Sequence, residues 1–264
     1  DAKVWSRNLH LVGLFEDTVF ARAFRQGANV AAAPAIEDLP DTKDNELVAD
    51  AAAATLHIPQ RFEQHVREAN KHIYTLIEYC AYINSCLSDS HYHLGLCRTV
   101  CIDEQIDGRS HKALELCKIV CKKDKNKVVL WGSLPCTGGC TWNYINALNP
   151  GGQERIAAHV ETMKQLLQKF IQVARIVKKE DGIVVFEWPL RCTYWKRDDI
   201  TRMISELGLH PTHVHGCALG LKSLNRGSEH MHLKKPWAIY SNCPDIHNVL
   251  KKYTCPGVSE NHQH

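Results

Sequence analysis

The 264-residue sequence predicts an α/β domain built on a mainly parallel sheet with helices on both faces, preceded by a helical N-terminal extension. Short apolar runs alternate with helical patterns from residue 74 onward, which is typical of strand–helix–strand units. Residues 154–177 keep apolar side chains at a helical period, as expected of a long helix packed on a sheet. All 12 cysteines follow residue 79, so the first part of the chain differs in composition from the rest.

The N-terminal extension is expected to comprise residues 1–73. It contains alanine-rich stretches and an acidic segment, residues 37–46, that is rich in helix-breaking residues. A helix is expected after Pro59, because apolar residues recur at helical spacing at Ile58, Phe62, Val66, Ala69 and Ile73. We therefore place the domain boundary near residue 74 and assign residues 74–264 to the α/β domain.

Six strands and three helices are predicted within this domain. Ser110 is a suitable N-cap for a helix that ends near Lys122, and Gly208 ends a helix that begins near Asp198. The strands are expected near residues 75–80, 98–103, 127–131, 183–187, 212–217 and 237–241. Because ligands of parallel sheets bind beyond the carboxyl ends of the strands, we expect one crevice to contain Glu78, Asp103, Cys136 and Glu187.

The composition predicts a globular protein without a membrane span, because no apolar run approaches the roughly 18 residues that a span needs. The formal net charge is only +3, so a nucleic-acid partner would have to be bound by local basic patches. The cysteines are spread along the chain, which favours free, buried thiols in a reducing compartment. We therefore expect an intracellular protein, nuclear or cytoplasmic.

A glycine-rich loop, Trp131-Gly-Ser-Leu-Pro-Cys-Thr-Gly-Gly-Cys140, follows the third predicted strand, and the strand at 183–187 ends in Glu187-Trp-Pro. Cys136 on this loop is a candidate nucleophile if it faces the crevice; the alternative is a buried structural thiol on a tight turn. The arrangement resembles the cytosine-C5 methyltransferases, which carry a Pro-Cys loop after the fourth strand and Glu-Asn-Pro/Val at the end of the fifth.

Further segments are similar to this family in the same order. Residues 207–221 resemble the segment after the family's glutamate, and residues 234–240 occupy the place of its arginine-bearing strand. Residues 76–85 and 100–104 occupy the places of the first two, cofactor-binding strands. The resemblance covers residues 74–264. It is nearer still to uncharacterised methyltransferase-like segments in mobile-element reading frames of protists, which share the Pro-Cys-Thr-Gly-Gly and Glu-Trp-Pro pattern.

The resemblance implies a Rossmann-like methyltransferase fold and an S-adenosylmethionine-dependent enzyme that acts on nucleic acid. It implies that Cys136 adds to C6 of a flipped-out cytosine and that Glu187 hydrogen-bonds the N3/N4 edge of that base. It also implies that Glu78, Asp103 and Ser85 line the cofactor cleft.

The sequence departs from the family at several positions. The first loop contains no glycine, and Tyr79 and Tyr82 are expected in the space that the methionine end of the cofactor needs. Lys234 and Lys235 stand in place of the family's arginine, and Cys140 provides a second thiol. We therefore predict weak or absent S-adenosylmethionine binding by the isolated chain.

Two further sets of residues are candidates for binding. Basic and aromatic residues that border the crevice are candidates for binding nucleic acid: Lys222, Arg226, Lys234, Lys235, Trp188 and Trp195. The alternative for the two tryptophans is that they only cover the end of the sheet. Near the C-terminus, four residues have the types that bind tetrahedral zinc: Cys243, Cys255, His262 and His264. Two alternatives to an enzyme follow: an inactive methyltransferase-like module that binds nucleic acid or protein, and a zinc-stabilised structural domain.

Overall fold

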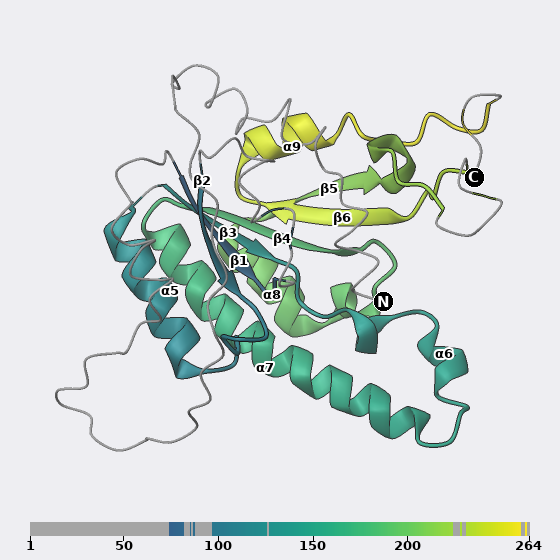
Figure 1. Ribbon diagram of the computed structural model, residues 1–264, viewed down its shortest axis with the longest axis horizontal. Coiled ribbons are helices and arrows are strands. Elements are labelled where there is room, and N and C mark those ends of the chain that lie inside the picture. The colour runs from purple at the N-terminus through teal and green to yellow at the C-terminus, as the bar shows by residue number, and fades with distance from the viewer. Residues whose placement is uncertain are drawn as a thin grey trace, which may run out of the picture.

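The computed structural model describes residues 74–81, 85, 87, 97–125, 127–223, 228, 231–259 and 262. These residues form an α/β fold with one six-stranded sheet, in the order β2-β1-β3-β4-β6-β5 (Figure 1). The strands are β1 (Tyr74–Tyr79), β2 (Cys97–Ile102), β3 (Val128–Gly132), β4 (Ile183–Pro189), β5 (His210–His215) and β6 (Pro236–Ser241). The helices are α5 (His111–Lys123), α6 (Asn143–Asn146), α7 (Gly152–Lys179), α8 (Asp198–Leu207) and α9 (Pro244–Leu250). The predicted extension, residues 1–73, lies outside the described residues.

The sheet is mixed, so the prediction of a mainly parallel sheet is wrong. β1, β2, β3 and β4 pair in parallel, whereas β6 pairs antiparallel with both β4 and β5. A parallel neighbour needs a crossover connection, usually a helix. Within the described part of the β5–β6 connection only a short 3-10 turn, Gly216–Leu219, is present, and the chain returns in the opposite direction.

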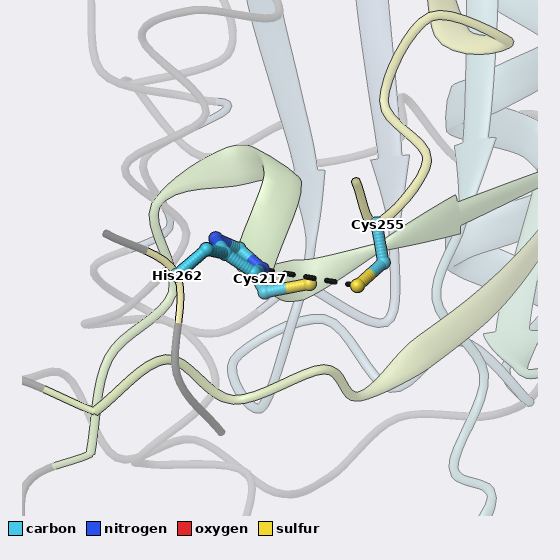
Figure 2. Close-up of side chains that lie close together, drawn as sticks. All are labelled: Cys217, Cys255 and His262. Carbon is cyan, nitrogen blue, oxygen red and sulfur yellow. Dashed lines mark hydrogen bonds between the residues drawn. The ribbon is translucent and has the colours of Figure 1, made fainter. Parts of the chain in front are cut away.

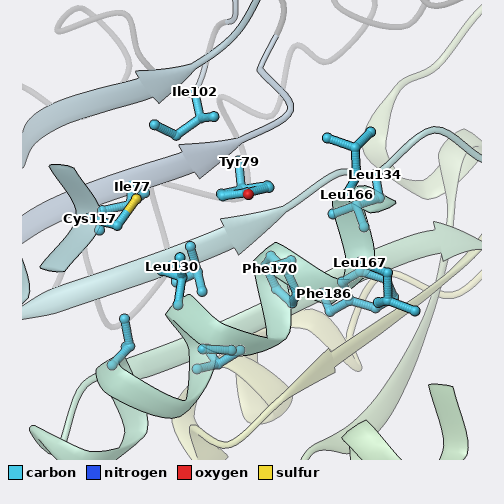
Figure 3. Close-up of a cluster of buried hydrophobic side chains, with 14 of the residues drawn as sticks. Ile77, Tyr79, Ile102, Cys117, Leu130, Leu134, Leu166, Leu167, Phe170 and Phe186 are labelled. Carbon is cyan, nitrogen blue, oxygen red and sulfur yellow. The ribbon is translucent and has the colours of Figure 1, made fainter. Parts of the chain in front are cut away.

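One face of the sheet is covered by α5, α7 and α8 (Figure 1). Alternate residues of the strands point to this face, among them Ile77, Tyr79, Leu130 and Phe186, and the rings of Tyr79 and Phe186 pack on Phe170 of α7 (Figure 3). The ring of Phe170 lies 5.6 Å from that of Tyr79 and 5.3 Å from that of Phe186, between centroids. This cluster fixes the three central strands from which the candidate site projects.

The opposite face carries the other set of alternate residues. Leu76, Val129 and Val185 belong to a second cluster, to which α9 contributes Ile246 and Leu250. Helix α9 packs against β5 and β6. Helices therefore contact both faces of the sheet, as the alternating pattern predicts. None of the helices formed by the described residues has the length and apolar character of a membrane span.

The predicted helix boundaries are close to the observed ones. The Ser110 hydroxyl accepts a hydrogen bond of 3.1 Å from the N–H of Ala113, which caps α5. Gly208 adopts φ of 63°, in the left-handed region, where α8 ends. Helix α7 begins at Gly152, two residues before the predicted start. A Cβ at this position would lie 2.0 Å from the Asn146 carbonyl oxygen, so the close approach of α6 requires glycine.

Candidate functional site

The candidate site lies beyond the carboxyl ends of β1, β3 and β4. The chain leaves β1 for β2 on one side and returns to β3 on the other, which makes β1/β3 a switch point of the sheet. Glu78 is the penultimate residue of β1, and Asp103 directly follows β2. Cys136 follows β3 in the glycine-rich loop, and Glu187 lies near the end of β4. The four predicted residues therefore follow or end strands that run in the same direction.

The loop that carries Cys136 is held by the segment after β4. The indole N–H of Trp188 donates a hydrogen bond of 2.6 Å to the Leu134 carbonyl, and the Thr193 hydroxyl donates one of 3.2 Å to the Gly139 carbonyl. Within the loop, the N–H of Gly139 donates to the Cys136 carbonyl at 2.9 Å, closing a 3-10 turn. The backbone that presents the thiol is thus fixed from both sides.

The two glycines of the loop are required by close packing. A Cβ added at Gly138 would lie 2.1 Å from the hydroxyl oxygen of Tyr194. A Cβ at Gly139 would lie 2.7 Å from Sγ of Cys192. Neither glycine has a positive φ, so space rather than backbone conformation explains the Gly-Gly pair. The Gly138-Gly139 pair is therefore explained by the close approach of the loop to Tyr194 and Cys192.

Glu187 is a buried carboxyl group at the end of β4, with 5% of its surface exposed. Burial raises its pKa to about 8, while a hydrogen bond from Ser133 and the charge of Lys235 act in the opposite direction. Its Oε2 atom has no hydrogen-bond partner among the described residues. At neutral pH the group is therefore mainly a neutral acid, which can donate one hydrogen bond and accept others.

Cys136 is half-buried and shares the electrostatic environment of Glu187. Burial raises the pKa of the Cys136 thiol, the charge of Glu187 raises it further, and the charge of Lys235 lowers it. The Lys235 ammonium lies 5.1 Å from the ring centroid of Trp237, on β6. Lys235 is exposed as a whole residue, but partial desolvation of its ammonium group lowers its pKa, whereas Cys136 and Glu187 raise it. A thiol, a carboxyl group and an ammonium group therefore influence one another's ionisation at this edge.

The residues predicted to bind S-adenosylmethionine make other contacts. Ser85 donates a hydrogen bond of 2.5 Å to Oε1 of Glu78, which is buried. Asp103 accepts one of 2.9 Å from the N–H of Gln105 in its own loop. The Tyr79 hydroxyl bonds the Gly108 carbonyl and ties the end of β1 to the loop after β2. These described residues fit the cofactor poorly, because the Glu78 and Asp103 carboxyl groups that would bind it are each engaged by a residue of the chain itself.

Tyr79 itself does not occupy the space predicted for it. Its ring is fully buried under α7, on the helix-covered face, instead of pointing into the loop after β1. The strand period explains this position, since Tyr79 alternates with Glu78 across the sheet. Tyr82, the other predicted obstacle, lies outside the described residues.

The predicted nucleic-acid residues separate into two groups. Lys222, Lys234 and Lys235 are exposed, and Arg226 lies outside the described residues. Trp188, however, is only 1% exposed, so its prediction as a base-stacking residue is wrong. Trp195 is half-buried and packs with its ring on Tyr240, at 4.8 Å between centroids. Both indoles close the end of the sheet, which is the alternative that the sequence left open.

Two exposed aromatic residues follow the Cys136 loop instead. Trp142 is 67% exposed and Tyr144 is 78% exposed, at the beginning of α6. Such large apolar side chains on the surface offer faces on which bases can stack. The sequence signal that identifies them is their place directly after the glycine-rich loop.

The predicted metal ligands are only partly brought together. Sγ of Cys255 lies 3.7 Å from Nε2 of His262, and Cys217 completes a group of three whose ligand atoms lie within 4.8 Å of one another. Cys243 is the N-cap residue of α9 and is not part of this group, so it was wrongly predicted as a ligand. His264 lies outside the described residues. Cys217 escaped prediction because it is distant in sequence and follows β5.

No protein-family model, no curated protein and no solved structure matches this chain.

Proposed function

We propose that this chain is a methyltransferase-like domain that acts on a cytosine base of nucleic acid through Cys136 and Glu187. The observation that carries the proposal is the buried carboxyl group of Glu187, whose Oε2 has no partner among the described residues and which influences the thiol of Cys136. A buried polar atom without a partner is costly unless a ligand satisfies it. A base bound at the strand ends would supply that partner.

Glu187 has the hydrogen-bonding capacity that a cytosine edge requires. A neutral carboxylic acid donates through its O–H and accepts through its carbonyl oxygen. Cytosine presents an acceptor at N3 and a donor at N4, so one carboxyl group can satisfy both atoms. The raised pKa keeps this proton on Glu187 near neutral pH. Donation to N3 withdraws electrons from the ring and makes C6 more electrophilic.

Cys136 then acts as a nucleophile toward C6. The thiol loses its proton, a bond forms between Sγ and C6, and C5 gains nucleophilic character. C5 takes up a proton from water. Loss of the original C5 hydrogen as a proton, followed by expulsion of Sγ, restores the aromatic base with its C5 hydrogen exchanged. The positive charge of Lys235 favours the thiolate that begins this sequence, because it lowers the pKa of Cys136.

S-adenosylmethionine is the methyl donor that the resemblance implies. The contacts of Glu78, Asp103 and Tyr79 give poor support to its binding. The same contacts favour a second candidate function, that of an inactive module that recognises a base without methylating it. The two functions differ in whether the Cys136 thiol reacts.

The exchange of the C5 hydrogen tests the reaction of Cys136 without any cofactor. We would incubate the full chain with oligonucleotides that contain cytosine tritiated at C5 and measure tritium released into water. The wild-type chain is expected to release tritium, and the Cys136→Ser variant is expected to lose this activity. Glu187→Gln should release tritium more slowly, because the amide cannot supply an acidic proton to N3.

Cys140→Ser is the matched control, because Cys140 is a half-buried thiol of the same loop. It should retain the wild-type rate. Release that persists in Cys136→Ser but disappears in Cys140→Ser would assign the reaction to Cys140 and contradict the proposal. No release by the wild-type chain, with retained binding of the oligonucleotide, would support the inactive module instead.

A further inference from the structure

Three potential metal ligands converge at the end of the sheet that carries β5. Cys217 lies in the 3-10 turn Gly216–Leu219 directly after β5, Cys255 lies beyond α9, and His262 lies close to the end of the chain. Figure 2 shows their side chains gathered together, with the imidazole of His262 toward the sulfur of Cys255. The three ligand atoms lie within 4.8 Å of one another.

The backbone around these residues is fixed by hydrogen bonds. The N–H of Cys255 donates to Nδ1 of His215 at 2.9 Å, and the N–H of His215 donates to the Tyr253 carbonyl at 2.9 Å. These two bonds attach the segment after α9 to the last residue of β5. Ser259 and His262 exchange backbone hydrogen bonds of 3.0 and 3.2 Å, which turn His262 back toward this segment.

A second imidazole supports the orientation of His262. The rings of His232 and His262 are stacked, with 4.6 Å between centroids and 22° between planes. His232 is itself bridged to Lys222 across the connection between β5 and β6. The ring of His262 is therefore held between this connection and the cysteine pair.

One pair of ligand atoms already has the spacing of a tetrahedral metal site, and the third atom lies within 4.8 Å of both. Thiolate sulfur and imidazole nitrogen bind zinc at about 2.0–2.3 Å, so two ligands of a tetrahedral ion lie roughly 3.4–3.8 Å apart. The distance between Sγ of Cys255 and Nε2 of His262, 3.7 Å, falls in this range. Two sulfur atoms and one imidazole nitrogen form a ligand set that selects zinc over magnesium or calcium.

We propose that Cys217, Cys255 and His262 bind one Zn²⁺ ion, which fastens the segment after α9 to the end of β5. Three protein ligands leave the fourth tetrahedral position to water or to another side chain. None of the three ligands belongs to the Cys136–Glu187 site, so the zinc site stands or falls independently of the proposed function. Because the ligands come from distant parts of the sequence, the ion would stabilise the folded state.

The test uses the purified full chain. After dialysis against a metal-free buffer, the zinc content per chain is measured by mass spectrometry of the elements. We expect about one zinc per chain, in line with the tight binding of structural sites. Replacement of zinc by Co²⁺ should give the intense visible bands of tetrahedral cobalt and a near-ultraviolet thiolate charge-transfer band. The cobalt spectrum requires no variant, so it tests the site even where substitutions prevent folding.

Variants then assign the ligands. Cys217→Ser, Cys255→Ser and His262→Ala should each weaken zinc binding more than about 100-fold, since even the loss of a supporting residue costs about 10- to 100-fold. Cys243→Ser and His213→Ala are matched controls, because neither residue belongs to the cluster, and both should retain zinc.

Three results would overturn the proposal. One is a chain without zinc whose cobalt form lacks tetrahedral bands. Another is equal loss of metal in the ligand variants and the controls. The third combines two observations. Peptide mass mapping of chain purified without reductant finds a disulfide between Cys217 and Cys255, and the same chain binds no zinc after the disulfide is reduced.

Discussion

The indole N–H of Trp188 donates a hydrogen bond of 2.6 Å to the carbonyl oxygen of Leu134. This bond joins the end of β4 to the loop that presents Cys136. The bond connects residues that are 54 positions apart in the sequence, and both of these residues are buried. The position of the thiol relative to Glu187 therefore depends on a residue that has no chemical role.

We predict that Trp188→Phe destabilises the domain. The substitution leaves the buried carbonyl of Leu134 without its donor, which costs about 1–3 kcal/mol, and the smaller ring adds a packing defect. Urea denaturation followed by circular dichroism measures this change. Trp142→Phe is the control, because Trp142 is 67% exposed and should change the free energy of unfolding by less than about 0.5 kcal/mol. Equal stability of Trp188→Phe and the wild type would refute the structural role of the bond.

The contact between Gly138 and Tyr194 provides a second prediction. Gly138→Ala should destabilise the domain by about 1–3 kcal/mol, because the added Cβ would lie 2.1 Å from the Tyr194 hydroxyl oxygen. That hydroxyl is buried without a partner among the described residues, so Tyr194→Phe alone should be neutral or stabilising by about 1 kcal/mol.

The double variant distinguishes this contact from a general effect of alanine. Tyr194→Phe removes the clashing oxygen and should recover part of the stability lost by Gly138→Ala; the remaining loss reflects Val160, 3.0 Å from the added Cβ. A double-mutant cycle of denaturation curves measures the coupling. Strict additivity of the two substitutions would contradict the proposed contact.

The sequence predicted the strands well because most are short runs of apolar and β-branched residues with clear ends, and in β5 the alternation of Thr212 and Val214 with polar residues gives the same signal. The direction of a strand cannot be predicted in this way, because parallel and antiparallel strands have the same hydrophobic period. The antiparallel orientation of β6 could therefore not be inferred from the sequence. Helix α9 was missed although Pro244 at its first position and Asp245 in its first turn are helix-start signals. Its length, Pro244–Leu250, is too short for a helical period to become evident.

The candidate site was predictable in part for the same reason. Glu78, Asp103 and Glu187 are recognised as polar residues at strand ends, and Cys136 through its glycine-rich loop. The burial of Trp188 depends on how the chain packs after β4, which local sequence does not specify. The metal cluster required Cys217, and only the pairing of β5 with β6 and the return of the chain after α9 bring it to Cys255.

Stability should decrease with rising pH because of Glu187. Its pKa is raised from 4.5 to about 8 in the folded state, so between these values the unfolded chain releases a proton that the folded chain retains. The stability that this pKa difference contributes is fully present below pH 4.5, and it is lost progressively as the pH rises to about 8. Each pKa unit corresponds to about 1.4 kcal/mol, which sets an upper limit of roughly 4–5 kcal/mol.

Glu187→Gln isolates this contribution, because glutamine resembles the neutral acid in shape and cannot titrate. Urea denaturation at pH 5 and pH 8, at constant ionic strength, should show a larger loss of stability in the wild type than in the variant. If both chains lose the same stability over this range, the folded pKa of Glu187 is not raised.

Calorimetry tests the binding of S-adenosylmethionine. We predict weak or absent binding, with little heat at millimolar cofactor, since the Glu78 carboxyl group is already bonded by Ser85 and the Asp103 carboxylate by the N–H of Gln105. The ribose contact that Asp103 offers is a single charge-assisted hydrogen bond, worth roughly 1.5–3 kcal/mol, and does not compensate for a Glu78 carboxyl group that Ser85 already engages. A micromolar dissociation constant that is lost in Asp103→Ala would show that the cofactor site is functional.

The exposed lysines predict how nucleic-acid binding responds to salt. Lys222 and Lys234 border the connection between β5 and β6, and each phosphate contact that a lysine makes releases counterions. Fluorescence anisotropy with a labelled oligonucleotide should give a dissociation constant that rises steeply with salt. Lys222→Ala and Lys234→Ala should each lower the slope of log K against log salt by about 1. Lys179→Ala is the control, because Lys179 is exposed at the end of α7 that leads into the amino end of β4, away from the strand ends where the site lies. A slope that falls equally in all three variants would show that the attraction is general charge rather than a contact of this surface.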